Sequence, residues 1–454
     1  MYQFVIAKAL AFWSLVIFVL TASYLSDSLV MSITLLYVLG ITIILRYGSN
    51  GLQDPRLLFV GFYLLYSSFY QIGGYIGLDL VFPFSCHSAL QAVHLATIGL
   101  VAYLVGTSIA CYGYKPLSIE VASQQYFCNS KVTAFYGSIF SIGTLLILCL
   151  LLLILSKGFQ SKREIVDLLS TPNQLALHLF TLLIAVCAIR LVAQTRPQFF
   201  SLYNVILIAV CLAYLLVAGE RDPLFRFLLI YVVIRSQTNS AKRFAFILTL
   251  VLVFAAAFIV PSSQIFKSVM LSGINMNKDS LMALLFSNEF IGPGRNLTAV
   301  VYFDAESDIS LIFSDMARGL IPSFIFDGQS AGSWYNNEFR VENGISGRSG
   351  WGFGLVPEGF VVGGTVGVVF LLSLLGLLMG IFYRFSQRSV MTNAAYTMLL
   401  VSSIYVIRSD LASFVSMTFK ILPLIFLSVF VLEKIFGFLV SGRSSGREHP
   451  KPLS

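Results

Sequence analysis

Long apolar runs recur along this chain, and each is bounded by polar or charged residues. An α-helix needs roughly 17 to 25 apolar residues to cross a bilayer, and we count about twelve such runs. They lie near residues 5–24, 29–45, 57–76, 90–113, 132–156, 174–192, 200–217, 223–236, 243–261, 354–383, 391–407 and 420–440. The run at 223–236 is the shortest. The pattern predicts an all-α polytopic membrane protein with about 12 transmembrane helices.

The composition supports this class and excludes others. Hydrophobic residues make up 57% of the chain and charged residues 11%, which is more apolar than a soluble globular domain. The net charge of +8 comes from Lys and Arg scattered over helix ends, without a basic run interleaved with aromatics, so nucleic acid is not an expected partner. The six cysteines show no CxxC spacing, and neither a zinc site nor a disulfide framework is indicated.

Lys and Arg near the ends of the runs predict the orientation, because cytoplasmic loops retain positive charge. With the N-terminus inside, most of them fall on the cytoplasmic side, while Lys157, Lys162 and Arg163 fall outside. The long polar segment between the ninth and tenth runs then faces outward. We therefore expect N-terminal membrane helices at 1–261, a large periplasmic loop at 262–353, C-terminal membrane helices at 354–441 and a cytoplasmic tail at 442–454.

The outer loop is expected to fold into short helices. Apolar patterns at 280–291, 295–304 and 309–321 are separated by Gly292-Pro293-Gly294 and end at Pro322, which predicts breaks at both points. Residues 328–354 mix glycine with Trp334, Tyr335 and Asn336. Flat apolar faces and amides suit sugar rings and hydroxyls, but a glycine-rich turn region with aromatics at the membrane interface shows the same composition.

Charged residues gather at the predicted outer rim. The turn Gly219-Glu220-Arg221-Asp222-Pro223 places Asp222 as a helix N-cap, four residues before Arg226, so we expect an ion pair between those two. Other members of the rim are Arg295, Arg318, Arg408, Asp410 and Glu358. An ionised residue at the edge of a membrane domain is a site candidate by default. The alternative is a network of Arg–carboxylate pairs that fixes the loop to the helices.

The arginines suit a diphosphate, because a guanidinium offers paired donors to phosphate oxygens and stays charged. A carboxylate among them suits a general base for a sugar hydroxyl. No His lies in the outer loop, and Asp304, Glu306 and Asp308 lack accompanying ligand types, so no metal or other cofactor is expected.

Four segments resemble the Wzy-type O-antigen (oligosaccharide repeat unit) polymerases. They are Gly219-Glu220-Arg221-Asp222, residues 321–339 with Asn336, Gly354–Gly364 around Glu358, and Ile407–Phe414. The resemblance covers about a third of the chain. It implies a metal-independent glycosyltransferase of lipopolysaccharide biosynthesis in the bacterial inner membrane, with its active site on the periplasmic side. Its substrates would be undecaprenyl-diphosphate-linked oligosaccharides, and its possible partner a Wzz-type chain-length regulator.

On this hypothesis Glu358 and Arg408 are catalytic. Arg221, Arg295 and Arg318 would stabilise the lipid diphosphate, while Glu220, Tyr335, Asn336 and Asp410 would contact the substrate. Three other readings stay open: a lipid-linked oligosaccharide flippase or other transporter, an O-antigen ligase, and sugar binding without turnover. Transporters commonly show repeated halves and charges deep in broken helices. An O-antigen ligase would share the lipid-linked donor. It resembles enzymes whose large outer loop carries a histidine, and the outer loop of this chain contains none.

Overall fold

In the computed structural model the chain is all-helical wherever it is described, which is at residues 2–77, 85–112, 130–156, 170–194, 201–218, 220–237, 290–321, 325–326, 328–345 and 352–442. The longer helices of the first half are α1 (Tyr2–Tyr24), α2 (Leu29–Tyr47), α3 (Pro55–Tyr75), α4 (Cys86–Ala110), α6 (Ser130–Leu155), α8 (Ser170–Ala193), α9 (Leu202–Ala218) and α10 (Asp222–Arg235). The second half contains α13 (Ile291–Tyr302), α14 (Ser310–Leu320), α15 (Ala331–Trp334), the π-helical η2 (Tyr335–Phe339), α16 (Arg340–Glu342), α17 (Leu355–Ser386), α18 (Val390–Arg408), α19 (Leu411–Val415), the π-helical η3 (Ser416–Ile421) and α20 (Leu422–Gly442).

Eight helices of the described part are long and apolar enough to cross a membrane, as a polytopic membrane protein requires. The predicted runs at 5–24 and 200–217 correspond to shorter apolar helices. The run at 223–236 is α10, whose 14 residues fall short of a bilayer-spanning length. The run at 243–261 lies outside the described residues.

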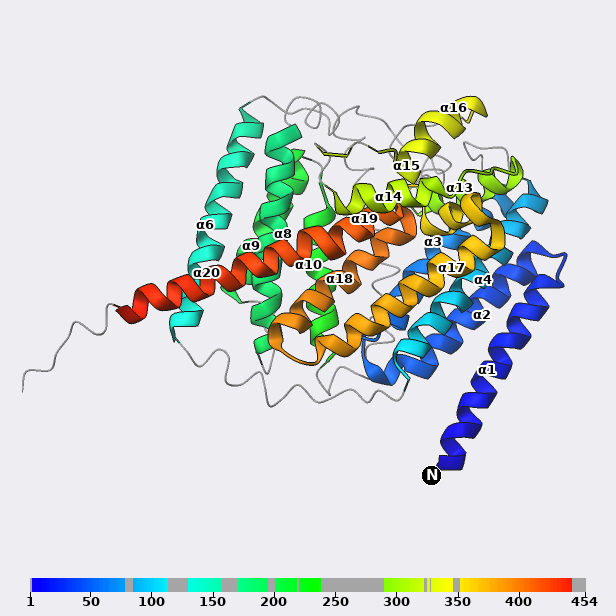
Figure 1. Ribbon diagram of the computed structural model, residues 1–454, viewed down its shortest axis with the longest axis horizontal. Helices are drawn as coiled ribbons and strands as arrows, with labels where there is room; N and C mark the ends of the chain where they lie inside the picture. Colours follow the sequence, from blue (N-terminus) through cyan, green and yellow to red (C-terminus); the bar gives the residue numbers. More distant parts are fainter. Residues whose placement is uncertain are drawn as a thin grey trace, which may run out of the picture. The chain divides into compact units, whose positions relative to one another are not determined.

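The chain divides into two compact units. The first comprises Met1–Tyr114, Asn239–Arg384 and Ser402–Lys420, and the second comprises the remainder. In the first unit α1 to α4 pack on one another, and α13 packs on α3 and α4. Figure 1 shows α13 to α16 gathered at one end of this unit. In the second unit α6 packs against α8, α9 and α20, and α10 packs against α8 and α9.

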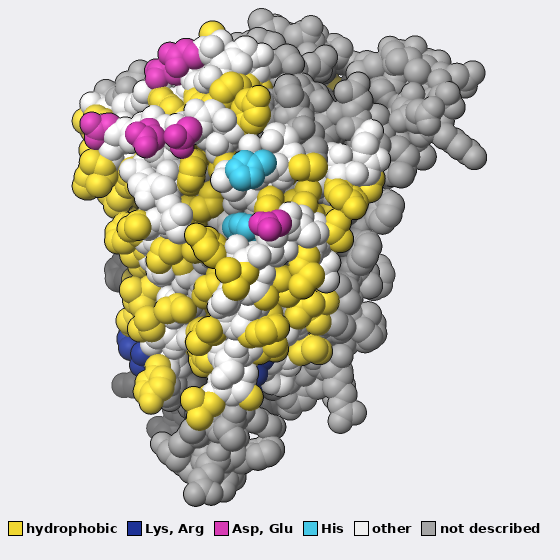
Figure 2. Space-filling view, turned by 90° about the vertical axis from the view of Figure 1, so that its right-hand side faces the viewer, with side chains coloured by type: hydrophobic (Ala, Val, Ile, Leu, Met, Phe, Trp, Pro, Cys, Tyr) yellow, Lys and Arg dark blue, Asp and Glu magenta, His cyan; other side chains and the backbone are white. Residues whose placement is uncertain are grey.

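Charge is distributed unevenly over the face of the first unit shown in Figure 2. Acidic side chains gather toward the upper end of this face, Lys and Arg side chains appear near the lower end, and apolar side chains cover the region between. The upper end is the one that carries α13 to α16 in Figure 1. The Lys and Arg side chains on this face therefore lie at the end away from α13 to α16 (Figure 2).

Helices α4 and α17 approach each other closely through small residues. A Cβ added to Gly376 would lie 2.3 Å from the carbonyl oxygen of Tyr103, and one added to Gly106 would lie 2.1 Å from that of Ser373. A Cβ added to Gly380 would lie 2.5 Å from the Cβ of Ala110. Such contacts are typical of helix pairs in membranes, where close van der Waals packing replaces the hydrophobic driving force.

Helix α17 is not continuous, although its sequence reads as one apolar run from 354 to 383. Gly363 and Gly364 have non-helical conformations, and Gly364 combines φ 55° with ψ −142°, which is essentially restricted to glycine. The backbones before and after this kink lie against each other, since a Cβ on Gly367 would be 2.0 Å from the carbonyl oxygen of Gly359. The short segment before the kink carries Glu358.

The predicted helix break at Gly292-Pro293-Gly294 is wrong, because α13 begins at Ile291 and runs through these residues. Proline is tolerated in a first helical turn, where its missing N–H has no intrahelical partner. Gly294 allows close packing, because a Cβ there would lie 3.1 Å from the carbonyl oxygen of Tyr66 on α3. The predicted helix at 309–321 is confirmed as α14, and most of the one at 280–291 lies outside the described residues.

Replacing Gly376 by Ala should destabilise the contact between α4 and α17 by about 1 to 3 kcal/mol, because the new methyl group meets backbone that cannot move aside. The matched control is Gly48→Ala, since a Cβ at Gly48 would meet nothing within 4 Å. Thermal unfolding in detergent should show a lower midpoint for Gly376→Ala alone. Equal midpoints for the two variants would contradict the packing described.

Candidate functional site

Three carboxyl side chains converge on the first turn of α19. The backbone N–H of Leu411 donates to Glu358 Oε2 (2.9 Å), that of Ala412 donates to Asp315 Oδ2, and that of Ser413 donates to Asp410 Oδ1 (3.2 Å). The first N–H groups of a helix have no intrahelical acceptor. Three consecutive donors of α19 are therefore satisfied by acids that come from α17, from α14 and from the residue before α19.

The backbone around Arg408 and Ser409 is held by a glycine-rich segment. The N–H of Gly354, which has φ 99°, donates to the carbonyl of Ser409 (2.8 Å). A Cβ on Gly352 would lie 1.7 Å from the carbonyl oxygen of Arg408, so only glycine fits there. Asn296 of α13 donates to the carbonyl of Gly352 (2.7 Å). These contacts fix the junction between α18 and α19, and with it the position of Asp410.

Asp315 and Glu358 form a buried carboxyl pair. Both side chains belong to residues that are 0% exposed, and they lie within hydrogen-bonding reach of each other. Glu358 Oε1 accepts no hydrogen bond from an N–H or hydroxyl group of the described residues. Two carboxylates in contact repel each other strongly, whereas one protonated carboxyl can donate to its neighbour. The arrangement therefore favours one shared proton.

The surroundings of Asp315 favour its protonated form. Burial, followed by the nearby charge of Asp410, raises its pKa to about 7, although the N–H groups of Ala331 and Ala412 act in the opposite direction. The remaining neighbour is the Glu358 carboxyl. Asp315 thus carries its proton to a pH far above the usual range of an aspartate.

A cluster of arginine and aromatic side chains lies in the same unit as the acids. Arg295 is 1% exposed and lies beside Tyr335, Arg340 and Tyr70. Burial lowers the pKa of Arg295 to about 10, so it remains charged at neutral pH, and burial raises the pKa of Tyr335 to about 12. The Tyr335 ring stacks on Phe353 at 4.8 Å, and Phe353 adjoins Gly352 and Gly354. The two clusters are joined through this segment.

The structure places the predicted site residues of the first unit in different surroundings. Glu358, Arg295 and Tyr335 are buried, while Arg318, Arg408, Asn336 and Asp410 are half-buried. Arg318 donates to the carbonyl of Gly328 (3.2 Å) and to the hydroxyl of Ser333 (3.5 Å), and the Arg408 guanidinium lies 5.6 Å from the Tyr405 ring centre. Asn336 accepts from Arg340 (3.1 Å) and donates to the carbonyl of Gly332 (2.7 Å).

One prediction about Tyr335 does not fit its environment. Its ring was expected to offer a flat face to a sugar, but the residue is 0% exposed and its ring stacks with Phe339 and Phe353. Composition alone does not distinguish an aromatic residue at a binding surface from one in a core.

Glu220 and Arg221 belong to the second unit, and both are half-buried. The predicted ion pair between Asp222 and Arg226 is confirmed at 2.8 Å. The predicted N-cap is wrong by one residue, because α10 begins at Asp222 and Arg221 occupies the cap position, where its side chain does not cap the helix. The carboxylate of Asp222 binds Arg226 instead of capping the helix.

Asp315 and Arg340 were not predicted as site residues. Asp315 lies on α14 between Leu311 and Gly319, each four residues away, and all three are buried. A carboxylate on the inward stripe of an amphipathic helix is a signal that the sequence does contain. Arg340 has no comparable signal, because its partner Asn336 and its neighbour Arg295 are recognised only from the fold.

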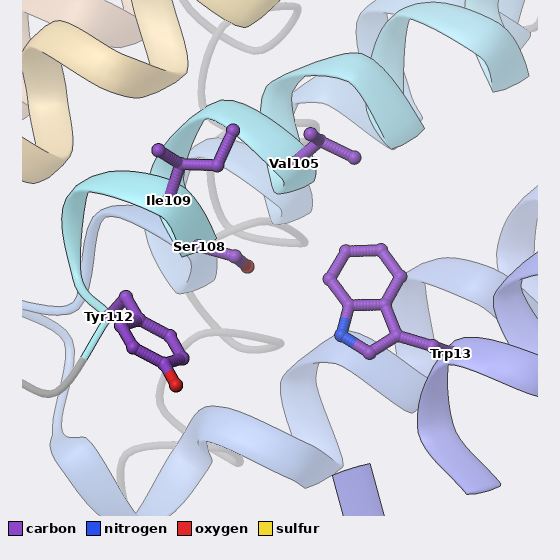
Figure 3. A pocket seen from close by; sticks show the side chains of 5 residues that line it. All are labelled: Trp13, Val105, Ser108, Ile109 and Tyr112. Carbon is purple, nitrogen blue, oxygen red and sulfur yellow. The ribbon is translucent and has the colours of Figure 1, made fainter. Parts of the chain in front are cut away.

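Besides this cluster, two features of the described residues can indicate a binding site: groups of possible metal ligands, and a cavity between α1 and α4. No group of three or more His, Cys, Asp or Glu side chains in the described part of the chain is placed to hold a metal ion. A cavity of about 380 Å³ lies between α1 and α4 and is lined by Trp13, Val105, Ser108, Ile109 and Tyr112. Figure 3 shows Trp13 facing the α4 side chains across this gap. Its lining carries no carboxylate or guanidinium, so it lacks the groups that transfer chemistry needs.

Comparison with known proteins adds no assignment. No protein-family model matches the chain, and no curated protein or solved structure is significantly similar to it.

The Asp315–Glu358 pair should make stability depend on pH. The folded pKa of Asp315 is raised from 3.8 to about 7, so its contribution is complete below pH 4 and is lost as pH rises through about 7, at up to about 1.4 kcal/mol per pH unit. Asp315→Asn should abolish this dependence, because burial and the charge of Asp410 act on the Asp315 carboxyl itself and an amide takes up no proton in this pH range.

Unfolding midpoints in detergent, measured across this pH window, test the pair. The control is Glu342→Gln, since Glu342 is exposed and its substitution should leave the wild-type slope intact. A wild-type midpoint that rises with pH, or equal slopes in wild type and Asp315→Asn, would show that Asp315 holds no proton in the folded protein.

Proposed function

We propose that this chain is a membrane glycosyltransferase that polymerises lipid-diphosphate-linked oligosaccharide repeat units. The reaction would take place at the outer face of a bacterial inner membrane. The growing glycan leaves its undecaprenyl diphosphate carrier and is joined to a hydroxyl at the end of a new lipid-linked unit.

The convergence of distant segments on α19 carries this proposal. Three of the four segments that resemble the O-antigen polymerases belong to the first unit: the one that reaches Asn336, the one around Glu358 and the one that contains Asp410. Asp315 links them, because it accepts from Ala331 at the start of α15 and from Ala412 of α19, and it contacts Glu358. These segments therefore form one cluster at the end of the candidate spans.

The charges of the cluster suit the two substrates. Arg295 and Arg340 lie close together, and guanidinium groups stabilise the negative charge that develops on a leaving diphosphate. The carboxyl groups at the start of α19 supply a proton acceptor for the attacking hydroxyl. The lipid carrier of such a substrate lies in the membrane, and its sugar chain lies in water. A site at the end of membrane helices can contact both.

A proton-coupled transporter of lipid-linked glycans is the second candidate. The buried pair of Asp315 and Glu358 favours it, because protonatable groups within membrane proteins commonly serve proton relays. This reading predicts that substrate crosses the membrane unchanged and that a pH gradient drives the movement. The glycosyltransferase reading predicts a new glycosidic bond without any gradient.

Purified protein in lipid nanodiscs tests the proposal directly. Lipid-linked repeat units isolated from the host cells should be converted into a ladder of longer glycans, with release of undecaprenyl diphosphate. Transfer to lipid A core instead would indicate a ligase. Unchanged repeat units in nanodiscs, together with translocation in sealed proteoliposomes, would favour the transporter.

Replacing Arg408 by Lys should reduce kcat/KM for polymerisation about tenfold or more, because an ammonium group keeps the charge but loses the paired donors that fit a diphosphate. The control is Arg388→Lys, which alters an exposed arginine between α17 and α18. Ladder length and rate should be normal in the control. Normal polymerisation in Arg408→Lys would remove Arg408 from the assignment.

A further inference from the structure

The three carboxyl groups around α19 differ in their access to a substrate. Asp315 and Glu358 are 0% exposed, whereas Asp410 is half-buried. A general base must come within hydrogen-bonding distance of the proton that it removes. By this criterion Asp410 is the carboxylate in the cluster that a sugar hydroxyl reaches without a rearrangement of the protein.

The oxygen atoms of the three groups also differ in the bonds they already make. Asp315 accepts from Ala331 and Ala412 with its two oxygens, and Glu358 accepts from Leu411 while its other oxygen lies near Asp315. Asp410 behaves differently. Its Oδ1 accepts both from the N–H of Ser413 and from the Ser413 hydroxyl (2.6 Å), and its Oδ2 accepts no hydrogen bond within the described part of the chain.

Glycine at position 332 leaves space beside this oxygen. A Cβ at Gly332 would lie 3.0 Å from Asp410 Oδ2, so any side chain there would crowd the carboxylate. Gly332 is also tied to the arginine cluster, because its carbonyl accepts from Asn336, which in turn accepts from Arg340. The uncommitted oxygen of Asp410 therefore lies at the boundary between the acidic and basic clusters.

We propose that Asp410 Oδ2 is the general base that deprotonates the acceptor hydroxyl, and that Asp315 and Glu358 share one proton and position Asp410 through α19. This inference rests on the proposed function and names the residue that performs its proton transfer. It assigns to Asp410 the role that the sequence suggested for Glu358.

The step balances with the two substrates alone. The acceptor oxygen forms a bond to the anomeric carbon while its proton passes to Asp410 Oδ2. The bond between that carbon and the diphosphate oxygen breaks, and its electron pair leaves with the lipid diphosphate. The proton on Asp410 then passes to solvent, which the half-buried position of the residue allows.

The carboxyl pair limits the negative charge near the base. The ionisable groups that face Asp315 are Glu358 from α17 and Asp410 before α19, while α15 contributes the N–H of Ala331. On its own helix, Arg318 directs its guanidinium to Gly328 and Ser333. With one proton shared, the pair carries one charge instead of two. It still accepts from Leu411 and Ala412 and so keeps the start of α19 in place.

Two charge-neutral substitutions separate the roles. Asp410→Asn keeps an N-cap oxygen for Ser413 but removes the base, so kcat should fall about 100-fold or more, with the KM for the lipid-linked donor changed little. Glu358→Gln keeps the bond to Leu411 and supplies a donor to Asp315, so it should retain kcat within about tenfold of wild type.

The wild-type ladder assay in nanodiscs is run first, because its failure would overturn the proposed function before any variant is compared. With an active wild type, normal kcat in Asp410→Asn, or a loss in Glu358→Gln as large as that in Asp410→Asn, would overturn the assignment. Asp410→Ser guards against misfolding, since serine also caps a helix. Added formate should restore part of its activity, and an absence of rescue in folded protein would count against the base.

Discussion

The structure of the first unit depends on how the first N–H groups of α19 are satisfied. A buried N–H without an acceptor costs about 1 to 3 kcal/mol. The first three N–H groups of α19 have no intrahelical acceptor, and those of Leu411 and Ala412 are buried. Glu358, Asp315 and Asp410 each accept from one of them. One short helical turn thereby fixes the segment before the kink of α17, the amphipathic helix α14 and the end of α18. The same bonds bring together acids that are distant in the sequence.

Electrostatic cost accounts for the composition of the cluster. Carboxyl groups at the end of membrane helices are expensive to bury, and the backbone donors of α19 together with one shared proton reduce that cost. The arginines follow a related principle, since Arg295 and Arg340 pack among Tyr335 and neighbouring aromatic rings. A region that already balances charge in this way can receive a charged diphosphate and a polar sugar with little further desolvation.

Hydropathy predicted most helices, because bilayer thickness fixes the length of apolar segments. It also identified Glu358 and Asp410, since a charge beside an apolar run is conspicuous. It did not identify Asp315, whose acceptor role depends on Ala331, Ala412 and Glu358, residues far from it in the sequence. The kink of α17 was missed for a different reason. Gly363 and Gly364 interrupt a run whose hydropathy is uniform, and hydropathy carries no information about φ and ψ.

Infrared spectroscopy of the carboxyl C=O stretch tests the central claim most directly, because a protonated carboxyl absorbs apart from carboxylates. Between about pH 5 and pH 9 the wild-type protein should show a protonated-carboxyl band that titrates near the pKa of Asp315, about 7. Asp315→Asn should lack this band. A wild-type spectrum without it, or an unchanged band in Asp315→Asn, would contradict a proton held by the pair of Asp315 and Glu358.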